Sequence, residues 1–326
     1  WDVPMSCPPA GSHTADPSGR ADDGANADAG ANADAGANAD LSATIGSALR
    51  WAVPLLAARG ADSPRLDAEV LLAHVVAASR VHLLAHRSDP LPAAAARRYR
   101  DLVIRRARGE PVAYLVGERA FYDVDLAVDR RVLIPRPETE MLVDEALRWC
   151  REGTDRCRRI ADVGTGSGAL AVVLARHLPE ARVWALDRSP AALALAASNV
   201  RRYGLAQRVL TVCGDLLAPV SGPLDLIVAN LPYVPAERLA GLDVGVRDYE
   251  PRDALDGGPD GLDVIRRLLP QAAERLATPG LLLLEIDEGQ GDAATAAAHS
   301  NLPDAHISVH RDYAGLERMV RVERAP

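Results

Sequence analysis

The chain of 326 residues contains no lysine, one phenylalanine and no long apolar run, and each of these absences narrows its interpretation. Without a stretch of about 18 apolar residues, no ordinary membrane-spanning helix is expected. The N-terminus has neither the basic flank nor the apolar stretch of a signal peptide, so we expect a cytoplasmic protein with no membrane partner. Because all 37 basic residues are arginines and aromatics make up only 4%, the composition indicates the bias of a GC-rich gene and not a function.

Recognisable metal-binding patterns are also missing. There is no C-x-x-C pair, and no histidine at ligand spacing, among Cys7, Cys150, Cys157 and Cys213. We therefore expect free thiols, with neither a zinc site nor a disulfide. His74 and His86 are interpreted as structural residues on helix faces, so no metal is expected.

An excess of positive charge is absent as well. The formal net charge is −8, and residues 1–40 contribute −6 of it through seven aspartates and one arginine. The remaining chain is therefore close to −2. A nearly neutral body lacks the broad positive field that nonspecific nucleic-acid binding needs, so no direct nucleic-acid partner is expected. A local patch of positive charge remains an alternative.

The N-terminal half divides into a polar tail and a helical region. Residues 1–40 include repeats of GANADA and hold too little apolar surface to offset the entropy of ordering, so we predict disorder. Residues 41–116 predict a small helical bundle whose first helix has Asp40 as N-cap. Its second helix has Ser63 as N-cap and Pro64 as first residue. One face of that helix is expected to carry Leu66, Val70, Leu71, His74 and Val75.

The remaining chain predicts a hairpin followed by an α/β domain. Residues 117–136 are expected to form a β-hairpin linker, with strands at 120–124 and 126–132. In residues 137–326, helical stretches alternate with five candidate strands, which predicts a doubly wound, mostly parallel sheet. Two final strands without a helix between them predict an antiparallel hairpin at the sheet edge. The seven candidates are Ile160–Val163, Arg182–Asp187, Val209–Cys213, Leu224–Ala229, Leu281–Ile286, His306–His310 and Met319–Val322.

A glycine-rich segment between the first of these strands and the next helix indicates a cofactor site. Its glycines permit a tight turn and close approach of a ligand to the helix N-terminus. The same pattern also fits dinucleotide binding. The residues expected to bind the cofactor here are Asp162, Gly164, Thr165, Gly166, Ser167 and Gly168.

Two carboxylates favour S-adenosylmethionine over a dinucleotide. Asp162 would repel a pyrophosphate, whereas its charge suits the ammonium of a methionine moiety. Asp187 ends the second strand, where it can accept hydrogen bonds from both ribose hydroxyls, although it also fits an N-cap for the helix near Pro190. Asp215 and Leu216, at the end of the third strand, fit contacts with adenine, or Asp215 is a simple loop residue. Together these elements predict a class I methyltransferase fold.

The tetrapeptide Asn230, Leu231, Pro232 and Tyr233 follows the fourth strand, where open α/β sheets bind ligands. Asn230 is expected to bind the cofactor as well as the substrate. An amide nitrogen is a poor nucleophile because its lone pair is delocalised. The Asn230 side-chain oxygen and the Leu231 carbonyl can each accept one N–H of a substrate amide and so orient it. Tyr233 would then wall the pocket, and Pro232 would stiffen the turn. A strand-ending turn with a packed tyrosine is the alternative interpretation.

Three ordered blocks resemble the PrmC/HemK family of peptide chain release factor N(5)-glutamine methyltransferases, over residues 41–326. They are Gly109–Gly117, Arg131–Glu140 (Arg-Val-Leu-Ile-Pro-Arg-Pro-Glu-Thr-Glu) and Tyr249–Asp263. The resemblance implies that the helical domain engages class I release factors. It also implies that the glycine segment, Asp187, Asp215 and Leu216 bind S-adenosylmethionine. The tetrapeptide from Asn230 to Tyr233 would hold the glutamine of a Gly-Gly-Gln loop.

Two positions depart from the family pattern. Leu231 replaces the first proline of Asn-Pro-Pro-Tyr, and Asp287 stands where the family often has glycine. Because the proposed contact uses a backbone carbonyl, leucine should preserve it. Asn-Leu-Pro-Tyr is also similar to the motif of ribosomal-RNA adenine dimethyltransferases. An N6-adenine methyltransferase of nucleic acid and a glutamine methyltransferase acting on a ribosomal protein therefore remain alternatives.

Overall fold

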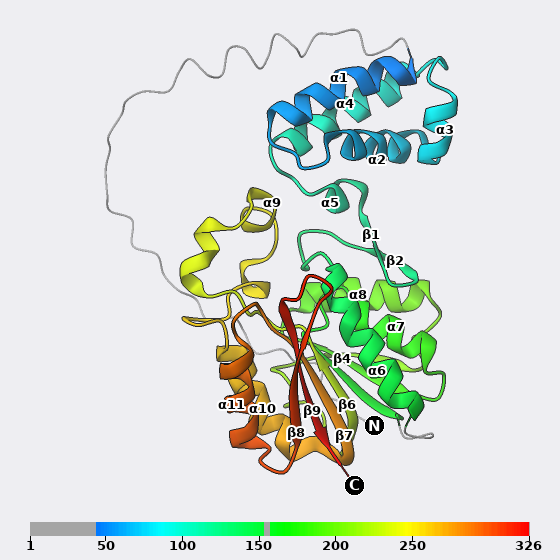
Figure 1. The fold of residues 1–326 in the computed structure, drawn as a ribbon. Helices are drawn as coiled ribbons and strands as arrows, with labels where there is room; N and C mark the ends of the chain where they lie inside the picture. The colour runs from blue at the N-terminus through cyan, green and yellow to red at the C-terminus, as the bar shows by residue number, and fades with distance from the viewer. Residues whose placement is uncertain (1–43, 153–156, 326) are drawn as a thin grey trace, which may run out of the picture. The chain divides into compact units, whose positions relative to one another are not determined.

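The computed structural model describes residues 44–152 and 157–325, and these residues form two compact units (Figure 1). One unit comprises residues 44–116 and the other residues 117–325. The tail predicted to be disordered, residues 1–40, lies outside the described residues. Within the described ranges, no helix is long and apolar enough to cross a membrane.

The N-terminal unit is a bundle of short helices around one apolar core. Tyr99 is fully buried in this core and donates its hydroxyl hydrogen to the carbonyl of Ala68 at 3.1 Å, so its polar atom is satisfied. The helices are α1 (Ile45–Ala58), α2 (Pro64–Val76), α3 (Arg80–Ala85), α4 (Ala93–Ala107) and α5 (Val112–Val116). The predicted helical bundle is therefore present in the described residues.

The helix starts agree only partly with the sequence prediction. Ser63 is the N-cap of α2 and Pro64 its first residue, as predicted. The N-cap of α1 is Thr44, where Asp40 was predicted. The Thr44 side chain accepts the N–H of Ser47 at 3.1 Å and the Ser47 hydroxyl oxygen accepts the N–H of Thr44 at 3.0 Å, which is a capping box.

The prediction of the apolar face of α2 is only partly correct, because Leu71 is buried as predicted and Val75 packs against the core. Leu66 is 42% exposed, and the buried positions are Ala68, Glu69, Leu71 and Leu72. Ala68 is fully buried, and its carbonyl accepts the hydroxyl of Tyr99, so α2 is joined to α4 at this point. The buried Glu69 accepts hydrogen bonds from Arg65 at 2.9 Å and from Arg80 at 2.8 Å, so its charge is compensated.

The second unit begins with a hairpin whose turn differs from the prediction. Strands β1 (Glu118–Phe121) and β2 (Val124–Ala127) pair antiparallel, with Phe121 opposite Val124. The turn therefore consists of Tyr122, which has a left-handed φ of 55°, and Asp123, whereas the prediction centred the hairpin on both Asp123 and Asp125. Both strands are shorter than predicted, because pairing ends at Ala127.

A seven-stranded sheet follows in the order β5-β4-β3-β6-β7-β9-β8. The first five strands in this order run parallel, whereas β9 pairs antiparallel with both β7 and β8. The strands are β3 (Arg159–Val163), β4 (Arg182–Asp187), β5 (Val209–Cys213), β6 (Leu224–Ala229), β7 (Leu276–Glu285), β8 (His306–Arg311) and β9 (Glu317–Arg324). The predicted doubly wound sheet with an antiparallel edge hairpin is confirmed.

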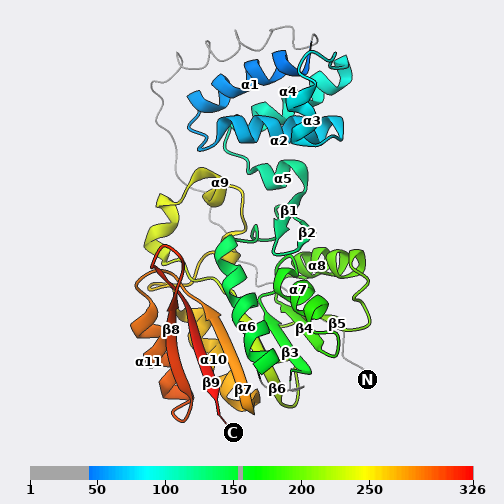
Figure 2. The same cartoon turned by 45° about the vertical axis from the view of Figure 1, so that its right-hand side comes forward.

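Helices cover both faces of this sheet (Figure 2). Ile160 packs in a core with α6 and α7, whereas its neighbour Ala161 packs in a second core with α10 and α11, because successive strand residues point to opposite faces. The helices of this unit are α6 (Glu140–Glu152), α7 (Ala169–His177), α8 (Pro190–Arg202), α9 (Val244–Arg247), α10 (Asp263–Arg275) and α11 (Gly291–Asn301). Short 3-10 turns include η2 (Pro137–Thr139), η3 (Ala236–Gly241) and η4 (Arg252–Ala254).

The prediction of free thiols is wrong. Cys150, in the last turn of α6, forms a disulfide with Cys157, just before β3, and their Cα atoms are 5.5 Å apart. Cys213 is also disulfide-bonded. A spacing of seven residues matches no cysteine motif, so no sequence pattern predicted this pair. The positions of the end of α6 and the start of β3 bring the two cysteines together.

Candidate active site

The glycine segment after β3 forms the centre of the candidate site. Gly164, Gly166 and Gly168 all have left-handed φ values, of 75°, 53° and 83°. The N–H groups of Gly164 and Thr165 both donate to the carbonyl of Leu186 at 2.8 Å, so the loop bends toward the end of β4. Helix α7 starts immediately afterwards, which directs its N-terminal N–H groups toward the same region.

Asp162 is buried beneath this loop. Its Oδ2 accepts the hydroxyl of Thr165 at 2.6 Å and the N–H of Ala171 at 3.0 Å. Burial raises the pKa of Asp162 to about 7, and these two hydrogen bonds act against the rise. Asp162 thus fixes the loop to the first turn of α7. A direct contact with the ammonium of a cofactor stays a prediction.

Asp187 ends β4 opposite Cys213 of β5. Its Oδ2 accepts the N–H of Gly166 at 3.0 Å, and its Oδ1 accepts the N–H of Ser189 at 2.9 Å. Burial raises the pKa of Asp187, and the backbone N–H groups oppose that shift. Because a carboxylate offers about four acceptor positions, Asp187 can also accept a hydrogen bond from a ligand hydroxyl.

The alternative role of Asp187 as helix cap is wrong. The N-cap of α8 is Ser189, whose side chain accepts the N–H of Ala192 at 3.2 Å. Asp187 instead ties the glycine segment to the turn before α8. Its position is therefore that of a loop-organising carboxylate with free acceptor capacity.

The corner after β5 carries the residues predicted to contact adenine. Leu216 is buried and has a left-handed φ of 51°, a strained conformation that is typical of functional sites in residues other than glycine. Asp215 is exposed, and its Oδ2 pairs with the guanidinium of Arg267 at 2.5 Å. To contact a ligand, the Asp215 carboxylate would have to leave Arg267 or bind both at once. Its contact with adenine therefore remains a prediction.

The tetrapeptide lies directly beside the glycine loop. Val163 pairs with Ala229, so the ends of β3 and β6 are adjacent at the point where the strand order reverses. A Cβ atom built on Gly164 would lie 3.0 Å from Cδ2 of Leu231 and 3.4 Å from the Asn230 carbonyl oxygen. The predicted cofactor loop and the predicted reactive residues are thus in contact.

Leu231 also has a role that the sequence did not indicate. Its side chain is only 3% exposed and belongs to the apolar core on the α10 and α11 face. The expectation that only its carbonyl matters is therefore incomplete, because the side chain also packs against the glycine loop.

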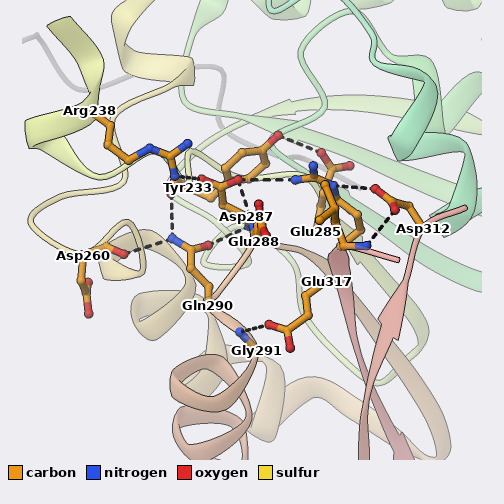
Figure 3. A network of polar contacts seen from close by, with 12 residues as sticks. Tyr233, Arg238, Asp260, Glu285, Asp287, Glu288, Gln290, Gly291, Asp312 and Glu317 are labelled. Atoms are coloured by element: carbon orange, nitrogen blue, oxygen red, sulfur yellow. Dashed lines mark hydrogen bonds and ion pairs between the residues drawn. The ribbon is translucent and has the colours of Figure 1, made fainter. Parts of the chain in front are cut away.

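Two residues missed by the sequence analysis hold the tetrapeptide in place. Thr139, at the end of η2, accepts a hydrogen bond from Nδ2 of Asn230 at 2.9 Å. Glu285, at the end of β7, accepts the hydroxyl of Tyr233 at 3.1 Å, as Figure 3 shows. Because Ala229 pairs with Leu284, strand register alone places Glu285 beside Asn230.

The titration of the buried groups reflects this low-dielectric environment. Burial raises the pKa of Glu285 to about 7, while hydrogen bonds from Thr139 and Tyr233 act in the opposite direction. Burial is the largest cause that raises the pKa of Tyr233, and the nearby charge of Glu285 is the second. Tyr233 therefore stays a neutral hydroxyl that donates to Glu285. A charged residue at the end of the otherwise apolar β7 was the available sequence signal for Glu285.

The Pro-Arg-Pro-Glu-Thr-Glu string meets the Tyr-Glu-Pro-Arg block in an ion pair. Glu250 has a side chain that is 1% exposed, and its Oε1 accepts Nη2 of Arg136 at 2.6 Å. Its Oε2 accepts the N–H of Ile134 at 3.2 Å. Burial raises the pKa of Glu250, and Arg136 opposes the rise. This contact fixes the segment that carries Thr139.

The glycines of the third block pack against the backbone of the tetrapeptide. A Cβ atom on Gly257 would lie 2.7 Å from the carbonyl oxygen of Pro232, and one on Gly261 would lie 2.1 Å from that of Tyr233. Gln290 also donates from Nε2 to the Tyr233 carbonyl at 2.9 Å (Figure 3). The spacing of these glycines therefore has a steric cause.

Asp287, the second departure from the family pattern, forms a bridge. Its carboxylate pairs with Arg238 of η3 and, at 3.4 Å, with Arg318 of β9 (Figure 3). The segment that follows the tetrapeptide is thereby linked to the edge strands of the sheet.

One group of possible metal ligands lies far from this site in the chain. His82, His86 and Asp89 bring one ligand atom each within 4.8 Å of one another, and all three residues are exposed. Exposure of every ligand makes this grouping alone insufficient to indicate a metal site.

Comparison with known proteins covers both units. Residues 47–117 match the PrmC N-terminal domain family, and residues 143–241 match the methyltransferase small domain family. A release factor glutamine methyltransferase from Moorella thermoacetica is 49% identical over 278 residues, which cover 84% of this chain and 96% of that protein. Its counterpart from Nitratidesulfovibrio vulgaris is 40% identical over 286 residues, covering 86% and 96% respectively.

A solved structure with a related description is the release-factor-specific protein-(glutamine-N5) methyltransferase from Alicyclobacillus acidocaldarius. It is 28% identical, with a TM-score of 0.38, and the match covers 59% of this chain and 95% of that chain.

Proposed function

Because this chain belongs to the family of release factor glutamine methyltransferases, we propose that it methylates the side-chain amide nitrogen of a glutamine in a release factor. The chain is an enzyme that uses S-adenosylmethionine as methyl donor. The proposed acceptor is the glutamine of the Gly-Gly-Gln loop in class I release factors.

The residues at the carboxyl edge of the sheet suit S-adenosylmethionine. The left-handed glycines leave the loop without side chains where the ligand would lie, and the carboxylate of Asp187 can accept the ribose hydroxyls. Leu216 provides a buried apolar surface for adenine. When bound, this cofactor supplies a methyl group on a positively charged sulfur.

The observation that carries the proposal is the contact between the glycine loop and the tetrapeptide at Gly164 and Leu231. This contact supports a site in which Asn230 lies near the methyl donor. The side-chain N–H of Asn230 donates a hydrogen bond to Thr139. The side-chain oxygen of Asn230 is therefore left as an acceptor for one N–H of the substrate amide. The Leu231 carbonyl is proposed to accept the second N–H.

With both N–H groups held, the substrate amide is oriented so that its weak lone pair faces the methyl donor. No strong base is needed, because the N-methylated amide cation loses its proton readily to water. Tyr233 forms the wall of the pocket, with its hydroxyl held by Glu285. The residues thus contribute orientation and polarisation and not proton abstraction.

The partner and the compartment follow from the same proposal. We expect the helical unit to engage the release factor, and no direct nucleic-acid partner. Since release factors act on ribosomes, we expect the enzyme to work in the cytoplasm.

The test combines purified enzyme, methyl-labelled S-adenosylmethionine and one acceptor at a time. A class I release factor should be labelled, the same factor with its Gly-Gly-Gln glutamine replaced should not, and Asn230→Ala should reduce labelling about a hundredfold or more. Label on nucleic acid or a ribosomal protein, with none on the release factor, would contradict the proposal.

A further inference from the structure

The amide of Asn230 functions only in one of its two orientations. The proposed task requires the side-chain oxygen to face the substrate amide, because a rotation of 180° would present an N–H to another N–H. Asn230 is only partly buried, so shape alone does not select between the two orientations. A specific partner must make this selection.

Thr139 is that partner in the structure. It is 4% exposed, and its Oγ1 accepts Nδ2 of Asn230 at 2.9 Å, across 91 residues of sequence. In this pair the amide nitrogen donates and the Thr139 oxygen accepts, so the side-chain oxygen of Asn230 is left for the substrate.

Glu285 holds the other end of the tetrapeptide. Its Oε1 accepts the hydroxyl of Tyr233 at 3.1 Å, so Asn230 and Tyr233 each have a buried polar partner outside the tetrapeptide.

The frame around this chain of hydrogen bonds is fixed. Arg136, three residues before Thr139, is held by the buried carboxylate of Glu250 at 2.6 Å. The parallel pairing of Ala229 with Leu284 fixes the separation of Asn230 and Glu285. The hydrogen bonds therefore connect three elements whose positions are set independently.

We propose that Thr139 is a positioning residue that holds the Asn230 amide with its oxygen toward the substrate. This inference rests on the proposed function. It assigns the threonine of the Pro-Arg-Pro-Glu-Thr-Glu string to the methyl-transfer step, through Asn230 and without contact with the substrate.

Valine and serine at position 139 separate this role from simple packing. Thr139→Val keeps the branched shape and removes the acceptor, whereas Thr139→Ser keeps the hydroxyl and removes a methyl group. We expect Thr139→Val to lower kcat at least about tenfold, because the amide loses its fixed orientation. We expect Thr139→Ser to restore most of the turnover.

The decisive experiment is a double-mutant cycle with Asn230→Ala on a release-factor substrate. If Thr139 acts through Asn230, the double variant Thr139→Val/Asn230→Ala should turn over at the same rate as Asn230→Ala alone. The dissociation constant for S-adenosylmethionine, measured by calorimetry, should be unchanged in every variant. Circular dichroism melts would show that the variants are folded.

Two outcomes would overturn the inference. The first is normal turnover by Thr139→Val, and the second is a loss from Thr139→Val that is equally large with and without Asn230. If Asn230→Ala itself kept normal turnover, or if wild-type enzyme did not methylate the release factor, the proposed function would fail instead.

Discussion

Replacing Asp187 with alanine tests whether this carboxylate binds the cofactor. In the structure its two oxygens each accept one backbone N–H, from Gly166 at 3.0 Å and from Ser189 at 2.9 Å. Because a carboxylate offers about four acceptor positions, it can accept the ribose hydroxyls as well. Asp187→Ala would remove both ligand contacts and also both contacts within the loop.

The expected loss of binding free energy for S-adenosylmethionine is about 1–3 kcal/mol, the scale of hydrogen bonds to a charged group. The loss stays within this range because burial raises the pKa of Asp187, so the carboxylate is already costly to keep ionised in the free enzyme. Isothermal titration calorimetry should therefore show a dissociation constant higher by roughly fivefold to 150-fold.

A cofactor analogue that lacks one ribose hydroxyl separates the ligand contacts from the loop contacts. If Asp187 binds the hydroxyls, Asp187→Ala should weaken binding of the deoxy analogue less than binding of S-adenosylmethionine. Unchanged affinity for S-adenosylmethionine, or equal losses for both ligands, would refute the reasoning. Either result would show that Asp187 organises the loop without binding the ribose.

Three further predictions concern stability. Glu250→Ala should lower the free energy of unfolding by about 2–4 kcal/mol in urea titrations, because it leaves the partly buried Arg136 without its ion-pair partner. A loss below about 0.5 kcal/mol would contradict the ion pair described here. Gly261→Ala should lower the free energy of unfolding by at least about 2 kcal/mol and also lower turnover, because its Cβ would lie 2.1 Å from the Tyr233 carbonyl. Gly289→Ala is the control, because Gly289 has a similar φ and nothing within 4 Å of its Cβ position. Its loss should be only the backbone strain of about 1–2 kcal/mol. Equal effects of the two glycine variants would remove the steric argument. Burial raises the pKa of Glu285 from 4.5 to about 7, so the folded state keeps a proton that the unfolded chain loses, and stability should decline from pH 4.5 to 7. Glu285→Gln should remove on the order of 3 kcal/mol of that decline in melts across this range, and parallel profiles for both proteins would contradict it.

Much of the parallel sheet could be predicted because its strands are short apolar runs that end at recognisable residues. Three strands, Arg182–Asp187, Val209–Cys213 and Leu224–Ala229, have the bounds that the sequence predicted. The hairpin turn was misplaced because Tyr122 adopts a left-handed φ that is uncommon for an aromatic residue. The disulfide between Cys150 and Cys157 was missed because proximity after a chain reversal has no sequence signature.

The residues of the candidate site also divide into those that the sequence could predict and those that it could not. Residues that follow strand ends, such as Asp187 and Asn230, could be found by their position relative to apolar runs. Thr139 and Glu285 could not, because they reach the site from 91 residues before Asn230 and 52 residues after Tyr233. Their relation to the tetrapeptide depends on strand register and on the packing of η2, which a single sequence does not reveal.

Tandem mass spectrometry of a release factor incubated with the enzyme and S-adenosylmethionine tests the central claim most directly. The account predicts one added methyl group, carried by the side chain of the glutamine in the Gly-Gly-Gln peptide and absent when the Asn230→Ala enzyme is used. A methyl group on any other residue, or an unmodified release factor under conditions in which the enzyme methylates another acceptor, would contradict it.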